Sequence, residues 1–186
     1  MNEETVKTDL PDEMPGELDD EAVLALGIAI SPEELDQALG EGEELLRAEP
    51  ELAGSPHGAA ALRLARDEHG TRGGAKYQRY FGYEDVFWCA LFVSWAVDMT
   101  GNRDHRAPWE TPAWVLHIHA WAQARRRLVS RPLHGDIFGL GGQHTGLVAG
   151  ATPDGSAIYT IEGNITDSVI SRNLSSSGLW FARLPD

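Results

Sequence analysis

Residues 87–101, with the sequence FWCALFVSWAVDMTG, constrain the fold of this chain more than any other segment. Their large apolar side chains recur at spacings of three and four, which predicts a helix. The residues between them are mostly apolar too, so we expect this helix to be buried on nearly every side. Gly101 stands where a left-handed residue would end it. The apolar stripe consists of Trp88, Leu91, Phe92, Trp95, Ala96 and Met99.

Cys89, the only cysteine of the chain, falls in the first turn of this predicted helix. Unpaired backbone N–H groups and the helix dipole favour negative charge there. A thiol in this position can have a lowered pKa and act as a thiolate nucleophile. The alternative is that Cys89 is a small core residue, the usual role of a lone cysteine in an apolar helix. A single cysteine excludes an internal disulfide and a multi-cysteine zinc site.

The acidic residues are concentrated at the N-terminal end. Residues 1–54 carry 17 acidic and two basic residues, a net charge of −15, whereas residues 55–186 carry 12 acidic and 13 basic residues, a net charge of +1. The sequence therefore predicts a near-neutral domain over residues 55–186, preceded by an acidic arm. A nucleic-acid-binding protein would show a basic face, which this chain lacks.

The acidic arm divides into segments of different character. Residues 1–20 are polar and contain two prolines, so we expect them to be disordered. A short helix is predicted over residues 20–29. Ser31 and Glu34 form an S-x-x-E capping box, which predicts a second helix up to about residue 48. The arm could dock a delivery partner, lie across a cleft as an inhibitor, or be a solvated extension, and charge runs are usually solvated.

The chain shows no feature of a membrane protein or of a secreted precursor. Its N-terminus has neither a basic start nor an apolar core, so no signal peptide of the usual kind is predicted. No apolar run is long enough to span a bilayer, and we expect no membrane insertion. We therefore expect synthesis in the cytoplasm.

Two more helices are predicted in the domain. Residues 50–56 form the expected linker, and Ser55 with Pro56 begins a helix that ends near Gly70. Its predicted inner residues are Ala60, Leu62, Leu64 and Ala65. The aromatic-rich residues 71–85 are predicted to be a loop.

The third domain helix begins at Thr111 and Pro112 and ends near Arg125, because cations suit a helix C-terminus. Its predicted apolar face contains Trp114, Val115, Ile118 and Trp121.

The last third of the chain has the pattern of strands. Its segments are short, rich in β-branched or aromatic residues, and separated by Gly, Pro, Asp and Ser. The TPDG turn at residues 152–155 predicts a hairpin. Three helices followed by a meander of about five strands predict an α+β fold, with the helices packed on an antiparallel sheet. The predicted strands occupy residues 135–140, 144–150, 157–164, 167–174 and 179–184.

This hairpin would place polar residues close to one another. His144 begins one strand, and Glu162 and Asn164 end the other. A thiolate nucleophile needs a base, and the base needs a group that orients it. The sequence thus offers Cys89 as nucleophile, His144 as base and Glu162 or Asn164 as partner. The alternatives are a structural histidine, a charge at the end of a hairpin and a turn residue, respectively.

Three blocks, FWCALFVSWA, GDIFGL…GGQHTGLVAG and IEGN, together resemble the CHAP domains, the cysteine, histidine-dependent amidohydrolases/peptidases of the papain-like superfamily. The resemblance covers residues 56–185. It implies a papain-like CHAP fold, with Cys89 as nucleophile and His144 as base. It also implies that Glu162 orients His144, that Asn164 completes the polar network and that the Cys89 N–H faces the oxyanion.

The resemblance further implies cleavage of amide bonds in peptidoglycan, either between muramic acid and alanine or within the stem and cross-bridge peptides. Such an enzyme would be a phage lysin or a delivered antibacterial toxin, acting on the cell wall after lysis, injection or non-classical export. Two alternatives stay open: a papain-like peptidase or deamidase acting on an intracellular protein, and an inactive module that binds wall peptide or a partner.

Substrate contacts and cofactors complete these expectations. Tyr83, Trp88 and Gln143 flank the reactive groups and are candidates for lining a substrate groove, although aromatic residues as often serve the core. Several phage CHAP domains bind calcium through closely spaced Asp residues before the cysteine. Only Glu84 and Asp85 occupy that region here, so we predict no metal and no other cofactor.

Overall fold

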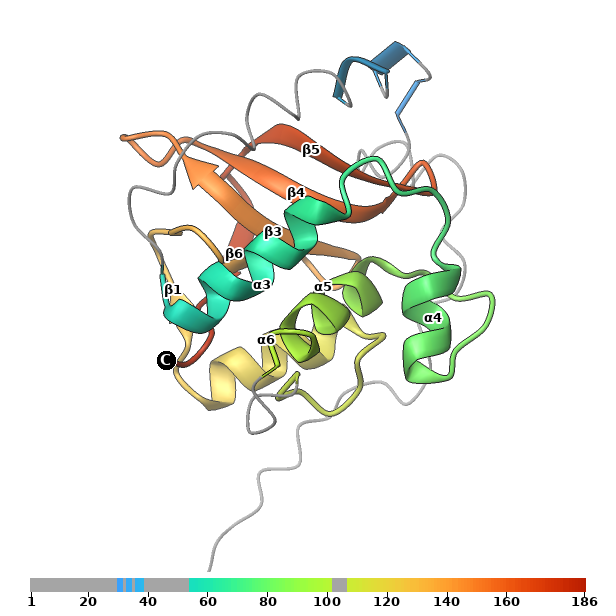
Figure 1. The fold of residues 1–186 in the computed structure, drawn as a ribbon. Coiled ribbons are helices and arrows are strands. Elements are labelled where there is room, and N and C mark those ends of the chain that lie inside the picture. The colour runs from blue at the N-terminus through green and yellow to red at the C-terminus, as the bar shows by residue number, and fades with distance from the viewer. Residues whose placement is uncertain (1–29, 32, 35, 39–53, 102–106) are drawn as a thin grey trace, which may run out of the picture.

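The computed structural model describes residues 30–31, 33–34, 36–38, 54–101 and 107–186. The predictions for residues 1–29 and 39–53 lie outside the described residues. The fold is α+β, as expected, and helices α3 and α5 lie on the face of an antiparallel sheet (Figure 1). The helices of the domain are α3 (Pro56–Asp67), α4 (Ala75–Phe81), α5 (Cys89–Asp98) and α6 (Val115–Ala124).

The sheet has six strands in the order β1-β6-β2-β3-β4-β5. All five expected strands are present, and β3 and β4 form the expected hairpin. Their bounds are β2 (Ile137–Leu140), β3 (His144–Ala151), β4 (Ala157–Ile165), β5 (Ser168–Ser175) and β6 (Leu179–Ala182). The two-residue strand β1 (Leu128–Val129) was not expected.

Strand β6 does not continue the meander. It returns to pair with β2 and with β1. The side chains of β6 explain this position: Phe181 joins an apolar cluster with Phe138 of β2. Trp180 covers Gly139, where an added Cβ would lie 2.0 Å from the indole ring.

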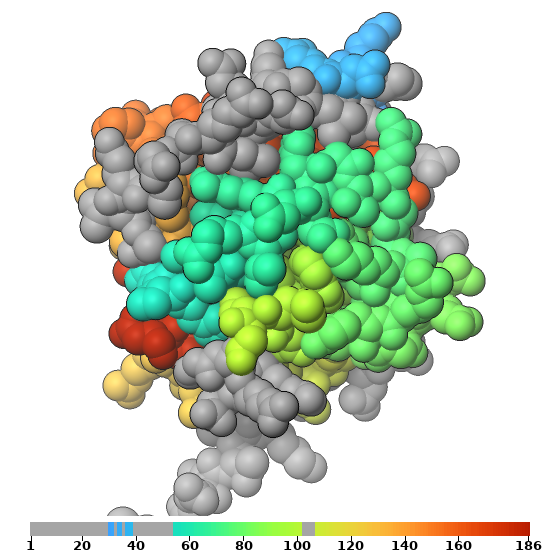
Figure 2. All heavy atoms as spheres, in the orientation of Figure 1, coloured from blue at the N-terminus to red at the C-terminus, as the bar shows by residue number. Residues whose placement is uncertain are grey.

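The helix that carries the cysteine forms as predicted, except that Met99 of the predicted apolar stripe lies beyond its end and is 45% exposed. Cys89 is the first residue of α5, and every residue from Cys89 to Val97 is buried. The helix ends at Asp98, and Gly101 follows with a φ of 79°. Figure 2 shows that the atoms of α3 and α4 form a continuous surface on this side of the molecule.

Helix α3 begins as predicted, because the Ser55 Oγ accepts a hydrogen bond of 3.0 Å from the Gly58 N–H. Its buried face is turned relative to the prediction. Ala60 and Leu64 are only half-buried. The buried positions are His57, Gly58, Ala61, Leu62 and Ala65.

The prediction of a loop over residues 71–85 is wrong, because Ala75–Phe81 forms α4. Tyr77 anchors this short helix: its ring is fully buried and stacks on Trp88 with the centroids 5.2 Å apart. Burial, together with Glu68, raises the pKa of Tyr77, whose hydroxyl donates to the Glu68 carboxylate. Gly82, with a φ of 77°, ends the helix. Tertiary packing thus outweighs the local preference of a segment that contains two adjacent glycines.

Helix α6 begins at Val115, later than predicted, and residues 111–114 form a turn instead. The Pro112 carbonyl accepts a hydrogen bond of 2.9 Å from the Ser94 hydroxyl of α5. This hydrogen bond ties residue 112 to α5, before the first residue of α6. The expected end of α6 before Arg125 is confirmed.

The described part of the acidic arm touches the domain. The capping box is confirmed: the Ser31 N–H donates to the Glu34 carboxylate over 2.8 Å, and the Glu34 N–H donates to the Ser31 Oγ over 3.2 Å. These bonds lower the pKa of Glu34. The Ile30 N–H donates to the Thr166 Oγ1 in the β4–β5 turn. Within the described residues, no helix combines the length and the apolar character that a membrane crossing requires.

Candidate active site

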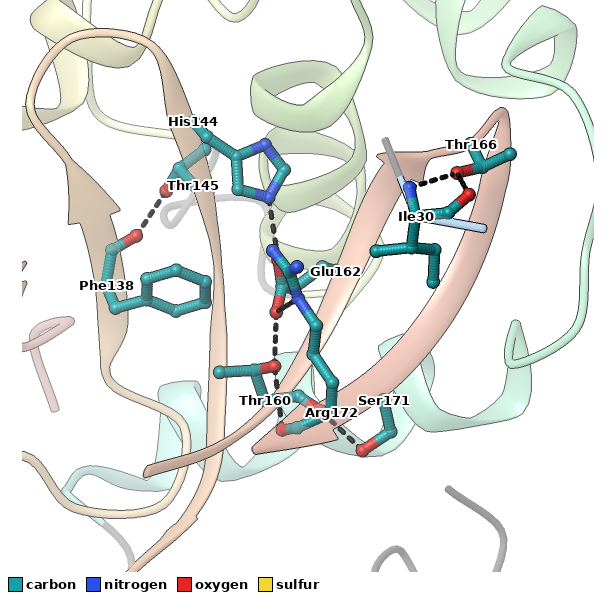
Figure 3. A network of polar contacts seen from close by, with 9 residues as sticks. All are labelled: Ile30, Phe138, His144, Thr145, Thr160, Glu162, Thr166, Ser171 and Arg172. Carbon is teal, nitrogen blue, oxygen red and sulfur yellow. Dashed lines mark hydrogen bonds and ion pairs between the residues drawn. The ribbon is translucent and has the colours of Figure 1, made fainter. Parts of the chain in front are cut away.

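The candidate site is built around His144, the first residue of β3. Its Nε2 lies 2.8 Å from Oε2 of Glu162 on β4, and both side chains are buried (Figure 3). The hairpin brings the two residues together although 18 positions separate them along the chain. A carboxylate on Nε2 fixes the tautomer of a neutral imidazole, with its proton on Nε2. The other ring nitrogen, Nδ1, is then left as the atom that can exchange a proton.

Gly146 makes room for this pair. A Cβ at this position would lie 2.9 Å from the Glu162 Cγ and 2.7 Å from the Phe138 ring. The Glu162 side chain can therefore cross β3 towards His144 only because residue 146 lacks a side chain.

Gly146→Ala is expected to destabilise the fold by about 1–3 kcal/mol, because it overpacks a tight contact. It should also slow alkylation of Cys89 by displacing Glu162. Gly150→Ala on the same strand is the control, since its nearest contact is a Tyr159 ring atom at 3.0 Å. Urea unfolding and iodoacetamide kinetics on both variants measure the two effects. Equal alkylation rates for the two variants would contradict this role of Gly146.

Cys89 reaches the site from the start of α5, where its side chain is 4% exposed. Helix α5 packs on β3 and β4. A second glycine permits the close approach, because a Cβ on Gly163 would lie 2.7 Å from the Phe92 Cβ and 2.7 Å from the Trp88 ring. The first backbone N–H groups of a helix have no partner within it. They are therefore available to bind a negatively charged oxygen beside the thiol.

The His144 ring also interacts electrostatically with Cys89. Within the described residues, the buried Nδ1 has no hydrogen-bond partner. Burial by itself lowers the pKa of His144, but the interactions with Cys89 and then with Glu162 outweigh it and raise this pKa to about 9. The raised pKa favours the protonated, imidazolium form of His144 at neutral pH.

The raised pKa of His144 predicts that the stability of the fold depends on pH. A histidine whose pKa is higher in the folded than in the unfolded state stabilises the fold fully below its unfolded value of about 6.5, and the contribution is lost as the pH rises through about 9. We expect the histidine NMR signals of the folded protein to include a titration near pH 9. In Cys89→Ala the His144 pKa should fall, because the interactions with Cys89 that raise it are lost. An unchanged His144 titration in Cys89→Ala would contradict the pairing.

Besides His144, two other side chains donate hydrogen bonds to the Glu162 carboxylate. Arg172 of β5 donates from Nε to Oε1 over 2.9 Å and from Nη2 to Oε2 over 2.8 Å, and the Thr160 hydroxyl donates to Oε1. Burial alone would raise the pKa of Glu162, but Arg172 and then His144 hold it well below its usual range. The carboxylate is therefore ionised and accepts hydrogen bonds on both oxygens.

Neither Arg172 nor Thr160 was identified from the sequence. Their positions depend on the register of β4 and β5, in which Thr160 lies opposite Arg172. Glu162 is two residues along β4 from Thr160, so the side chain of Arg172 reaches it diagonally. The sequence could have identified Arg172 as part of the site only if the register of the β4–β5 hairpin had been assumed.

Asn164 lies at an irregularity of β4 and not in this network. The β4–β5 register shifts between Glu162 and Ile165, and Asn164 has a left-handed φ of 66°. Asparagine tolerates this conformation better than most residues. Among the described contacts, its side chain makes no hydrogen bond to His144 or Glu162. The structure therefore places Asn164 in a bulge beside the site, and its predicted part in the polar network stays a prediction.

The three candidates for substrate contact lie in different settings. Trp88 is a core side chain, 3% exposed, with its Nε1 donating to Asp167 over 3.2 Å. It packs between α4 and β4 and does not line an open surface. Tyr83 is half-buried against the core, and Gln143 is exposed in the β2–β3 turn immediately before His144. The predicted contact of Tyr83 and Gln143 with a substrate stays a prediction.

Within the described residues, no group of three or more His, Cys, Asp or Glu side chains could hold a metal ion. The site that the fold assembles consists of a thiol, an imidazole, a carboxylate and a guanidinium. Comparison of the chain with family models, with curated proteins and with solved structures finds no match. The geometry of these four groups is therefore the basis on which a function can be proposed.

Proposed function

We propose that the chain is a cysteine hydrolase that cleaves amide bonds of peptidoglycan through a thiolate nucleophile and an acyl-enzyme intermediate. The observation that carries this proposal is the pairing of His144 Nε2 with the buried Glu162 carboxylate at 2.8 Å, which leaves Nδ1 for Cys89 at the start of α5. A nucleophile, a base and a group that orients the base are the parts that such catalysis needs.

The first chemical step is acylation. The Cys89 thiolate attacks the carbonyl carbon of the amide, and the carbonyl oxygen becomes an anion. Free N–H groups at the start of α5 would bind this oxyanion. The C–N bond then breaks as His144 donates its Nδ1 proton to the leaving nitrogen, which departs as an amine. The acyl group stays on Cys89 as a thioester.

The second step is hydrolysis. His144, now neutral, takes a proton from water, and the hydroxide attacks the thioester carbon. The C–S bond breaks, the carboxylic acid product leaves, and the thiolate–imidazolium pair is restored. Glu162 stays ionised throughout and holds the ring in one tautomer.

Peptidoglycan is proposed as the substrate because of the resemblance of the three sequence blocks to CHAP domains. We also propose, on the same ground, that residues 55–186 form a papain-like CHAP domain, and that the enzyme acts on the wall as a phage lysin or delivered toxin. The order helix with cysteine, strand with histidine, strand with glutamate is compatible with this proposal.

The test is digestion of purified peptidoglycan by the full chain and by Cys89→Ala, with the products identified by mass spectrometry. Release of muropeptides by the wild type alone would support the proposal and identify the bond that is cut. If neither protein releases products but Cys89 reacts rapidly with iodoacetamide at neutral pH, peptidoglycan is the wrong substrate, and a protein substrate is tested next. An inert Cys89 would overturn the hydrolase proposal itself and favour a binding module.

A further inference from the structure

Arg172 forms a two-bond ion pair with the carboxylate that orients His144, and its side chain is only 15% exposed. Counting the Thr160 hydroxyl and His144, the Glu162 carboxylate accepts four hydrogen bonds, two on each oxygen. In the view of Figure 3 the His144 ring lies above Glu162, and the Arg172 side chain reaches the same carboxylate from below. Rotation of the carboxylate would break several of these bonds at once.

We propose that Arg172 is a positioning residue, which fixes the plane of the Glu162 carboxylate and thereby holds the His144 ring with Nδ1 towards Cys89. This inference rests on the proposed function, because it assigns Arg172 to the same site. Arg172 itself acts through Glu162 and His144 and is not proposed to touch the substrate.

The geometry of the guanidinium supports this role. Nε and Nη2 lie in one rigid plane, and each bonds a different oxygen of Glu162. A two-bond contact of this kind defines the orientation of a carboxylate, whereas a lysine ammonium supplies a point charge without a plane. The Oε2 atom then directs its remaining lone pair at the His144 Nε2. A small rotation of the carboxylate would turn the imidazole away from the thiol.

The charges of the site lead to the same conclusion. The groups that face His144 are Cys89 of α5 and Glu162 of β4, and Arg172 of β5 faces Glu162 in turn. In the reactive state these four groups carry two negative and two positive charges, so the buried site is neutral as a whole. Without Arg172 the same site would hold a net negative charge, which is costly away from water.

A matched control exists in the same chain. Arg183 binds Asp136 in nearly the same way, with Nε 3.0 Å from Oδ1 and Nη2 2.8 Å from Oδ2. This pair joins the end of β6 to the start of β2, and it makes no contact with Cys89, His144 or Glu162 among the described bonds. Arg183→Met therefore removes a similar ion pair without touching the site.

The experiment compares Arg172→Met, Arg172→Lys, Arg172→Ala and Arg183→Met in the full chain. We expect both Arg172→Met and Arg172→Lys to lower kcat by on the order of 10²-fold with little change in KM, the effect of misplaced reacting groups. Alkylation of Cys89 by iodoacetamide should slow in parallel, and Arg183→Met should alter neither rate. Millimolar guanidinium chloride should restore alkylation in Arg172→Ala, whereas sodium chloride should not.

A readout that needs no substrate separates this inference from the proposed function. In the wild type, the His144 Nε2–H proton should give a slowly exchanging NMR signal, because it is buried and bonded to Glu162. In Arg172→Lys, which keeps a positive charge beside Glu162 and so preserves the charge balance of the buried site, this signal should broaden or exchange faster. A sharp wild-type signal together with an unchanged alkylation rate in Arg172→Lys would overturn the positioning role, even if peptidoglycan is never cleaved.

Discussion

His144→Ala is expected to lower hydrolysis on the order of 10⁴-fold or more while the protein stays folded. The loss follows because the substitution removes both the base and the imidazolium that stabilises the thiolate. The fold should tolerate it, since the Glu162 carboxylate keeps its bonds to Arg172 and Thr160. Turnover of the substrate and the rate of Cys89 alkylation at neutral pH measure the chemical loss, and circular dichroism measures the fold.

His57→Ala is the matched control for this experiment. His57 is also a buried histidine, but it lies on α3 and its Nε2 is 3.4 Å from the Val97 carbonyl, at the opposite end of α5 from Cys89. We expect His57→Ala to cost stability and to leave the alkylation rate near that of the wild type. If His144→Ala and His57→Ala reacted equally fast with iodoacetamide, His144 would not be the base.

Glu162→Ala is expected to cause the largest loss of stability of any substitution in the site, about 3–5 kcal/mol. The variant removes the carboxylate that pairs with both a buried guanidinium and a buried imidazole, and breaking a buried ion pair from one side carries a cost of this size. Chemical unfolding should show a lower midpoint with an unchanged slope. The apparent rate of Cys89 alkylation should fall as well.

A double-mutant cycle with Arg172→Met gives this prediction its internal control. Because Glu162 and Arg172 are in direct contact, we expect the double variant to be less destabilised than the sum of the two single variants. Replacing both members by apolar residues removes the isolated charge that each single variant leaves behind. Strict additivity would show that the pair contributes no specific interaction to the folded state.

The features that the sequence predicted correctly are those with a local cause. The apolar stripe of residues 87–101 is enough to predict α5 with Cys89 in its first turn. The TPDG turn predicts the β3–β4 hairpin, and the hairpin brings His144 to Glu162. The capping serines Ser31 and Ser55 also have local causes, because each accepts a hydrogen bond from the backbone N–H three residues further along the chain.

The features that were missed depend on contacts between distant segments. Helix α4 is stabilised by the packing of the Tyr77 ring on Trp88, and the local sequence of the helix does not predict that contact. The place of β6 depends on Trp180 covering Gly139. Arg172 belongs to the site only through the β4–β5 register. A shift of one residue in that register would place its side chain on the other face of the sheet.

The two close contacts at Gly146 and Gly163 determine where this protein could be engineered. Both glycines sit beside Glu162, and each is packed against large side chains with no space for a methyl group. A library that seeks a new substrate should therefore leave both positions invariant. Diversity belongs instead at exposed positions next to the reactive groups, such as Phe87 and Gln143. Random mutagenesis of the whole domain would also place side chains at Gly146 and Gly163, where the tight contacts make them destabilising.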